Sequence, residues 1–291
     1  MTLMGGFCTV RLMRALRRAS VLAALLVSAL VSPGLAPAAL ANHGGSNVVL
    51  KPADGVTRRN KLVLFIPGTN LTPQQSMDFL NHAANAGFHV IGISYTNKKS
   101  VAKICKKDGD ACFGQVRREI VFGTDSSPRV DVSVDKSILG LLKAEVLRQS
   151  DTAPDADGWD QYRSGDFLIL NNIIATGHSQ GAGHAAIIGI DRTIWRVGLL
   201  AGPNDVVRGT GAVPSWTRGP RTTPSSVWRA MTNQDDDSRP DQEDSWDNFG
   251  IGSSSPARQI VSGGGDPHLS VVIDGQLASG IQTRWTTLLG A

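Results

Sequence analysis

The chain contains the stretch Ile173-Ile-Ala-Thr-Gly177-His178-Ser179-Gln180-Gly181-Ala-Gly183-His184-Ala-Ala, in which a serine stands between two glycines. The apolar run before it is typical of a buried strand, and the small and apolar residues after it indicate a helix at 183–190. A sharp turn from strand to helix lifts the hydroxyl of Ser179 above a sheet and leaves room only for small residues such as Gly177 and Gly181. The helix then directs its positive end, and the N–H of Gln180, at an anion that forms beside the serine. The alternative is a turn of small residues whose serine does no chemistry.

The segments around this stretch alternate between strand and helix patterns. Residues 61–66 form an apolar run that ends at Pro67-Gly68, residues 72–86 have a helical pattern that starts at Thr72-Pro73, and residues 89–94 are again apolar. Strand, helix and strand in this order predict an α/β fold with a mostly parallel central sheet and helices on both faces. We expect further strands and helices at 47–51, 135–149, 173–177, 196–201, 227–232, 259–262 and 277–289.

Residues 95–134 depart from this alternation, because they are rich in charged and turn residues. We expect an excursion from the sheet with a short helix at 115–122, and the part from 97 to 134 is a candidate cover for a pocket. The excursion contains Cys105 and Cys112. The two cysteines are close in sequence, and the chain has the N-terminal pattern of an exported protein, which meets oxidising conditions. They therefore predict a structural disulfide. A metal site would need further Cys or His ligands nearby, and a redox pair usually has the spacing Cys-x-x-Cys.

The first 41 residues have the pattern of a signal peptide. Four arginines come first, an apolar run follows at 21–31, and Ala39-Leu40-Ala41 supplies the small residues that a signal peptidase requires. We therefore expect cleavage before Asn42, a single mature domain at 42–291, and a secreted or periplasmic protein. A transmembrane anchor is the alternative, but the apolar run is shorter than the ~20 residues that a bilayer needs. Both the general and the twin-arginine export routes stay open.

The charge of the mature chain argues against a nucleic-acid-binding protein. Residues 1–41 hold four of the 29 basic residues and none of the 25 acidic ones, so 25 basic and 25 acidic residues remain after cleavage. Without a net positive charge the compositional support for binding nucleic acid is lost.

The sequence also has no dinucleotide fingerprint, so we expect no organic cofactor. No further apolar run is long enough to anchor the mature chain in a membrane, and its oligomeric state stays open.

On these residues the chain resembles the α/β-hydrolase superfamily, and in particular an exported bacterial branch with Gly-His-Ser-Gln-Gly at the nucleophile turn. The resemblance covers about residues 61–268, and the turn around Ser179 is its most specific part. It implies that Ser179 is a nucleophile and that the turn at 67–70 carries the second oxyanion donor. Gly68 would let the backbone approach the substrate closely, and the N–H of Thr69 is the expected donor. A plain tight loop is the alternative.

The superfamily order of nucleophile, acid and histidine leaves two candidates for the base, since only His184 and His268 follow Ser179. His184 lies on the helix after the turn, where we expect a structural histidine whose hydrogen bonds are satisfied. His268 lies in a glycine-rich loop, Gly263-Gly-Gly-Asp-Pro-His268, that follows the last predicted strand. It is therefore the predicted base, and an incidental surface histidine is the alternative.

The acid has three candidates. The strand predicted at 227–232 is followed by Asp235, Asp236 and Asp237, and one of these carboxylates would fix the tautomer of His268. We favour Asp236, keep Asp235 as a close second, and expect Asp237 to point away. Asp205 is third. The acidic run at 235–244 lacks the spacing of a defined calcium loop, so we interpret it as a solvated loop and expect no metal.

Taken together, the sequence predicts an exported serine hydrolase that cleaves an acyl bond through a Ser-His-Asp triad. A carboxylic ester, small or polymeric, is the expected substrate because esters are the usual exported substrates of the superfamily, which is an argument by analogy. A thioester or a peptide bond stays open as the bond cleaved. A protein of another class, a non-catalytic envelope binding protein with the same fold, is the runner-up.

Processing of the N-terminus gives a prediction that mass spectrometry checks. Protein recovered from the cell envelope or the medium should have the intact mass of a chain that starts near Asn42. Its mass should also be two hydrogens lower than that of the reduced chain, because Cys105 and Cys112 are bonded. A full-length mass, or two thiols that react under non-reducing conditions, would contradict this prediction.

Overall fold

The computed structural model describes residues 46–153 and 155–291. The predicted signal peptide at 1–41 and its cleavage point lie outside these residues. Within the described part of the chain, no helix is long and apolar enough to cross a membrane.

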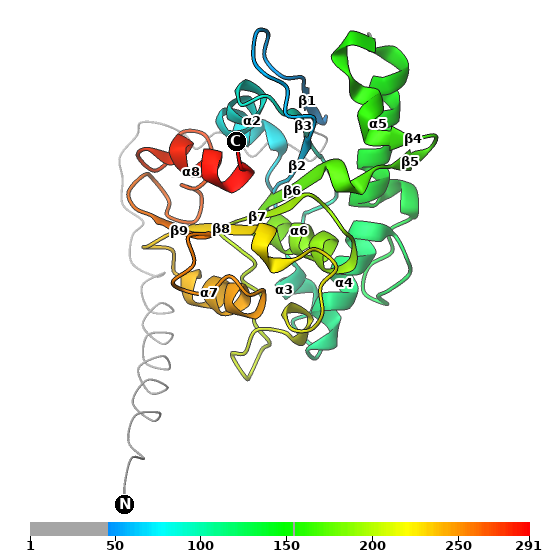
Figure 1. Ribbon diagram of the computed structural model, residues 1–291. Coiled ribbons are helices and arrows are strands. Elements are labelled where there is room, and N and C mark those ends of the chain that lie inside the picture. Colours follow the sequence, from blue (N-terminus) through cyan, green and yellow to red (C-terminus); the bar gives the residue numbers. More distant parts are fainter. Residues whose placement is uncertain (1–45, 154) are drawn as a thin grey trace, which may run out of the picture. The chain divides into compact units, whose positions relative to one another are not determined.

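The described chain is organised around a seven-stranded sheet with the strand order β1-β3-β2-β6-β7-β8-β9 (Figure 1). The first edge strand, β1, is antiparallel to β3, and every other neighbouring pair is parallel. All the predicted strands are present. Their bounds are β1 Val48–Leu50, β2 Leu62–Ile66, β3 His89–Gly92, β6 Ile173–His178, β7 Arg196–Leu200, β8 Trp228–Asn233 and β9 Arg258–Val261.

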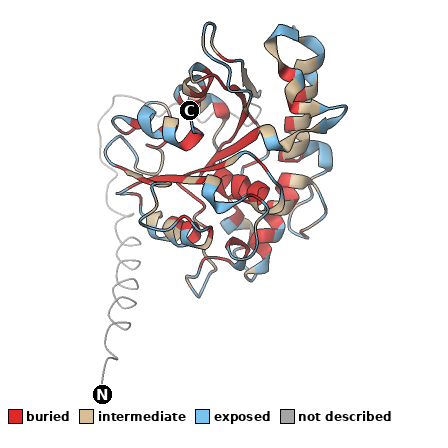
Figure 2. Ribbon diagram, viewed as in Figure 1, coloured by how far each residue is buried: buried red, intermediate tan, exposed pale blue. Residues whose placement is uncertain are grey.

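The strands at the centre of the sheet are buried on both faces, which is why their sequences are continuous apolar runs rather than alternating ones (Figure 2). In β2, Leu62, Leu64 and Ile66 belong to one hydrophobic cluster. Val63 and Phe65 belong to another. Because successive side chains of a strand point to opposite faces, the two clusters are the cores above and below the sheet.

Helices cover both faces, as predicted (Figure 1). On one face, α2 (Met77–Asn85) packs against α8 (Ile281–Leu289), and both contribute to the core that holds Phe65. On the other face lie α4 (Ala111–Phe122), α5 (Ile138–Thr152), α6 (Gln180–Asp191) and α7 (Arg239–Asn248). The short elements are η2 Pro73–Ser76, α3 Val101–Ile104, η3 Val134–Lys136, η4 Asp155–Asp157, η5 Trp159–Tyr162, β4 Arg163–Ser164, β5 Phe167–Leu168, η6 Leu170–Asn172, η7 Ser215–Thr217 and η8 Ser225–Val227.

Several predicted helices have different bounds in the structure. The helix predicted at 72–86 begins with the 3-10 turn η2, and the one predicted at 135–149 begins at Ile138, where Ser137 accepts a hydrogen bond from the N–H of Gly140. The C-terminal helix starts four residues later than predicted, because Gly280 has a left-handed backbone (φ 66°) that interrupts it.

Two segments contain more helix than the sequence predicted. The excursion at 95–134 holds two helices, α3 and α4, and α4 starts four residues before the single helix predicted at 115–122. The interpretation of 235–244 as a solvated acidic loop was wrong, because residues 239–248 form helix α7. Pro240 stands in the first turn of that helix, where its missing N–H costs no hydrogen bond.

The predicted disulfide is present in the structure. The sulfur atoms of Cys105 and Cys112 are bonded, with Cα atoms 5.8 Å apart. Cys105 ends α3, and Cys112 lies in the first turn of α4. The bond therefore joins the two helices of the excursion to each other, and both residues are buried in the core on the α6 face.

Candidate active site

The site begins at the junction between β6 and α6, where the strand ends at His178 and the helix starts at Gln180. Ser179 lies between them with φ 55° and ψ −117°, a backbone conformation that residues other than glycine rarely adopt. Its N–H donates to the carbonyl of Leu200 on the neighbouring strand β7 at 2.8 Å. The sheet thus fixes the turn from one side while the helix fixes it from the other.

The two flanking glycines lie where backbone segments pass very close to each other. A Cβ on Gly177 would come within 2.2 Å of the carbonyl oxygen of Gly181, and a Cβ on Gly181 within 2.0 Å of the carbonyl oxygen of Ile66. Both oxygens belong to backbone, which cannot move aside as a flexible side chain can. Any larger residue at either position would therefore push α6 away from β2 and β6.

The side chains of Ser179, His268 and Asp236 form a chain of hydrogen bonds. Ser179 Oγ lies 2.9 Å from His268 Nε2, and His268 Nδ1 lies 2.8 Å from Asp236 Oδ2. Because a carboxylate only accepts, the proton of the neutral imidazole is on Nδ1, and Nε2 is free to accept the serine proton. The His268 side chain is 26% exposed and that of Asp236 only 2%, so the chain of bonds runs from the protein interior to the surface.

Asp236 lies three residues beyond the end of β8 and is held by several donors. Gln242 Nε2 donates to its Oδ2 at 2.9 Å, and the N–H of Ser238 donates to its Oδ1 at 2.8 Å. Burial by itself raises the pKa of Asp236, but the hydrogen bond and charge of His268 together with these donors outweigh it and lower the pKa below its ordinary value. Asp236 is therefore ionised at neutral pH. Asp235 and Asp237, on either side of it, are exposed to solvent.

The backbone of His268 is fixed on both sides. Its N–H donates to Asp266 Oδ1 at 2.8 Å, and its carbonyl oxygen accepts from His178 Nε2 at 2.8 Å. Burial, and secondly the nearby His268, lower the pKa of His178 to about 3. His178 is therefore neutral with its proton on Nε2, and this hydrogen bond ties the loop of the candidate base to the last residue of β6.

The turn after β2 packs against the serine. A Cβ on Gly68 would lie 3.1 Å from the Cβ of Ser179, so only glycine allows this approach without displacement. The N–H of the next residue, Thr69, has no acceptor among the residues that the structure describes. Gln180 is the first residue of α6, so its N–H has no partner within the helix. Both predicted oxyanion donors thus lie in segments that contact Ser179.

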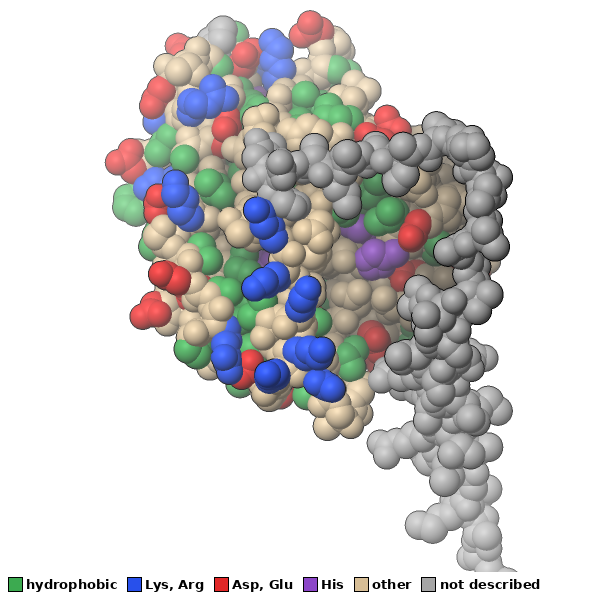
Figure 3. Space-filling model, turned by 180° about the vertical axis from the view of Figure 1, so that it is seen from behind, with side chains coloured by type: hydrophobic (Ala, Val, Ile, Leu, Met, Phe, Trp, Pro, Cys, Tyr) green, Lys and Arg blue, Asp and Glu red, His purple; other side chains and the backbone are tan. Residues whose placement is uncertain are grey.

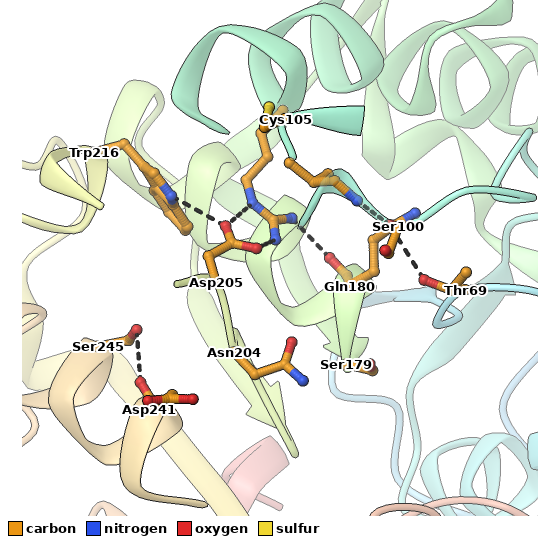
Figure 4. Close-up of polar contacts among 12 residues, drawn as sticks. Thr69, Ser100, Cys105, Ser179, Gln180, Asn204, Asp205, Trp216, Asp241 and Ser245 are labelled. Atoms are coloured by element: carbon orange, nitrogen blue, oxygen red, sulfur yellow. Dashed lines mark hydrogen bonds and ion pairs between the residues drawn. The ribbon is translucent and has the colours of Figure 1, made fainter. Parts of the chain in front are cut away.

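The side chain of Gln180 connects three parts of the site (Figure 4). Its Oε1 accepts from Thr69 Oγ1 at 3.2 Å and from the N–H of Val101, at the start of α3, at 2.9 Å. Its Nε2 lies 3.4 Å from the hydroxyl of Tyr95, which in turn donates to the carbonyl of Pro67 at 3.0 Å. Gln180 therefore holds the turn at 67–70 and the excursion in fixed positions relative to α6.

A buried ion pair holds the backbone of Gln180 from the other side. Arg117 on α4 donates to the carbonyl of Gln180 at 3.0 Å and pairs with both carboxylate oxygens of Asp205 at 2.7 Å. Their side chains are 1% and 3% exposed, and Trp216 Nε1 donates to the same carboxylate at 3.2 Å (Figure 4). A Cβ on Gly183 would lie 2.2 Å from the guanidinium carbon, so the glycine makes the space for Arg117.

Two further residues named from the sequence have other surroundings than the acid and base positions require. Asp205, the third candidate for the acid, is instead the partner of Arg117. His184 is fully buried, but its hydrogen bonds are not satisfied as predicted, because neither ring nitrogen has a partner in the described chain. It packs edge-on against Tyr95, with ring centroids 5.6 Å apart. Burial, and secondly the charge of Arg117, hold the pKa of His184 well below its usual value, so the ring is neutral.

Sequence reasoning missed three contributors to the site. Gln242 and Arg117 are separated from their partners by six and 88 residues, and nothing in the sequence pairs them. His178 precedes the serine in the quoted stretch, and its position at the end of a buried strand is the signal that could have suggested a structural role.

In the described residues, no group of three or more His, Cys, Asp or Glu side chains is arranged to hold a metal ion.

The hydrogen bonds of Asp236 predict which carboxylate matters for hydrolysis of an activated ester. Replacing Asp236 by Asn should lower kcat by about 10³–10⁴, because the imidazole of His268 can then take the wrong tautomer. The matched change of the exposed neighbour Asp235 should cost less than about tenfold. A large loss for Asp235→Asn, with Asp236→Asn close to wild type, would show that the acid is wrongly placed.

No family model and no curated protein matches this chain. Among solved structures, it is similar to an alpha-beta serine hydrolase homologue from Coxiella burnetii, with a TM-score of 0.44 and 15% identity over 84% of this chain and 88% of that one. YahD with malic acid follows, with a TM-score of 0.38 and 11% identity over 84% and 98%. A phospholipase/carboxylesterase from Dyadobacter fermentans has a TM-score of 0.37 and 13% identity over 85% and 100%. The mostly parallel sheet, with its strand–serine–helix turn at β6, gives this chain the α/β-hydrolase fold.

Proposed function

We propose that the protein is an exported serine hydrolase that cleaves an acyl bond. The proposed substrate is a carboxylic ester. The observation that carries the proposal is the chain of hydrogen bonds from Ser179 Oγ through His268 to Asp236. A nucleophile, a base oriented by a carboxylate and two N–H groups beside the nucleophile are the parts that acyl transfer needs.

The first half of the proposed reaction transfers the acyl group to the enzyme. Ser179 Oγ attacks the carbonyl carbon of the ester while its proton moves to His268 Nε2. The negative charge on the former carbonyl oxygen is held by the N–H groups of Thr69 and Gln180. The bond from carbon to the alcohol oxygen then breaks, and His268 gives its proton to that oxygen. The products are the free alcohol and an acyl ester on Ser179.

The second half releases the acid. Water attacks the acyl carbon and loses a proton to His268 Nε2, and the same two N–H groups stabilise the new oxyanion. The bond to Ser179 Oγ breaks, the proton returns to the serine, and the carboxylic acid leaves. Throughout, Asp236 stabilises the imidazolium form of His268 without taking its proton. Removal of a single oxyanion-hole donor from a serine hydrolase can raise the barrier by about 3–4 kcal/mol.

The choice of an ester as substrate rests on analogy with exported proteins of this fold. A thioester or a peptide bond passes through the same tetrahedral intermediate, so both belong to the same proposal. Rates on matched 4-nitrophenyl esters, thioesters and anilides of one short acyl group would rank the three bonds, and the ester should be cleaved fastest.

A fluorophosphonate probe tests the proposal directly. It should label the wild-type protein at Ser179, and Ser179→Ala should lose both labelling and ester hydrolysis while its thermal unfolding stays near that of wild type. Activity is lost while the fold persists, because the substitution removes only the nucleophilic hydroxyl and leaves the hydrophobic core unchanged. Ser253→Ala is a matched control, since Ser253 is exposed and lies outside the site.

Two results would contradict the proposal. One is full labelling of Ser179→Ala, which would place the reactive nucleophile elsewhere. The other is a wild-type protein that neither reacts with the probe nor hydrolyses any of the activated substrates. That outcome favours the runner-up, an envelope binding protein that keeps the hydrolase fold without the activity.

A further inference from the structure

A cavity of about 260 Å³ lies next to the turn that carries Thr69. It is lined by nine residues, among them Lys98 and Lys136, with no acidic side chain in its lining. The two lysines come from different parts of the chain, since Lys98 follows β3 and Lys136 ends η3, just before α5. The lining also includes the polar residues Thr72 and Asn97 and the apolar residues Leu71 and Leu141. The volume suits one substituent of a substrate rather than a whole ligand.

Hydrogen bonds connect this cavity to the reacting groups. Asn97, in the cavity wall, donates through Nδ2 to the carbonyls of Gly68 at 2.6 Å and Leu71 at 2.8 Å. Its own carbonyl accepts from the N–H of Asn70 at 3.1 Å. Leu71, at the end of this turn, lines the cavity, and Gly68, at its start, lies so close to Ser179 that an added Cβ would be 3.1 Å from the serine Cβ. The cavity and Ser179 therefore adjoin the same short turn.

The same side of the site has an unusual excess of positive charge. Five of the nine lysines in the whole chain fall within residues 98–107, a segment without a single acidic residue, and all five are exposed. They are Lys98, Lys99, Lys103, Lys106 and Lys107. None of them takes part in an ion pair among the described residues. Lys and Arg side chains gather in a row on this face, beside the area where histidine reaches the surface (Figure 3).

The acidic residues next to these lysines in the sequence have other partners. Asp108 is paired with Arg129, and Asp110 Oδ1 accepts from the N–H of Ser215. Asp135 lies 3.5 Å from Lys136, but both side chains are more than 70% exposed and Asp135 does not line the cavity. Such an exposed pair contributes little, so the ammonium group of Lys136 is available to another anion.

We propose that the substrate of this hydrolase carries a negatively charged group, such as a carboxylate or a phosphate, that binds in the cavity between Lys98 and Lys136. The proposal rests on the proposed function and adds a substrate class to it. The lysines 99–107 raise the local concentration of such anions by their field, while Lys98 and Lys136 bind the charged group directly. An interaction of this kind is made equally in the ground state and the transition state, so it should lower KM and leave kcat nearly unchanged.

Two matched pairs of esters test the proposal and locate the charge. In the first pair, 4-nitrophenyl hemisuccinate carries a carboxylate on the acyl half, and 4-nitrophenyl methyl succinate is its neutral counterpart. In the second pair, 4-acetoxybenzoate carries the carboxylate on the alcohol half, and its methyl ester is neutral. The wild-type protein should show a KM about tenfold lower for the anionic member of at least one pair. The pair that shows the preference identifies the half of the substrate that enters the cavity.

The double variant Lys98→Gln/Lys136→Gln should lose most of this preference, with its KM for the anionic ester rising about tenfold. Its thermal unfolding should stay near that of wild type, because both side chains are exposed, and this shows that the variant is folded. The charge-matched control is Lys106→Gln/Lys107→Gln, which removes two positive charges from the same segment but none from the cavity lining. It should keep most of the preference.

Three results would overturn this inference. A wild-type protein that hydrolyses the neutral esters and shows no preference in either pair has no anion subsite, although the proposed function stands. An equal loss of preference in the control variant would mean that only the general field acts and that the cavity is not the binding place. Absence of hydrolysis in both pairs, together with absence of fluorophosphonate labelling, would remove the proposed function and this inference with it.

Discussion

Ser179 is held with φ 55° and ψ −117° at the point where β6 turns into α6, and the rest of the site depends on this turn. A backbone in this region costs of order 1–3 kcal/mol and persists only where the surroundings impose it. Here the buried strands on either side, the hydrogen bond to Leu200 and the close passage at Gly181 impose it. Each of these constraints comes from the packed core of the sheet, so the position of the hydroxyl follows from the fold rather than from a loop.

Two buried arrangements extend from that turn to the remaining groups. Neutral His178 fixes the carbonyl of His268 and so ties the loop after β9 to the end of β6. Arg117 fixes the carbonyl of Gln180 and so ties the excursion to the start of α6. A buried ion pair such as Arg117–Asp205 contributes little net stability by itself, because desolvation offsets its attraction. Its bidentate geometry, however, fixes where α4 and α6 meet.

The sequence predicted the sheet and the three central side chains, because the strand–serine–helix pattern and the order of the remaining histidines and acids are local or ordinal features. Ser179 follows from the pattern, His268 follows from the order of groups in the superfamily that the chain resembles, and Asp236 was favoured over Asp235 and Asp205. The structure brings the three side chains within hydrogen-bond distance. The partners of Arg117, Gln180 and Gln242 could not be predicted, since they depend on how segments far apart in the chain pack. For the same reason His184 was expected to be hydrogen-bonded, whereas neither of its ring nitrogens has a hydrogen-bond partner among the described residues. Helix ends were misplaced where a single residue such as Gly280 decides them.

The crystal structure of the protein after reaction with a small fluorophosphonate tests the central claim most directly, because the bound phosphonyl group has the geometry of the tetrahedral intermediate. The account predicts phosphorus bonded to Ser179 Oγ, with one phosphonyl oxygen about 2.7–3.1 Å from the backbone nitrogens of both Thr69 and Gln180. His268 Nε2 should stay within hydrogen-bond distance of Ser179 Oγ. Phosphorus on another residue, or a phosphonyl oxygen that contacts neither nitrogen, would contradict the account.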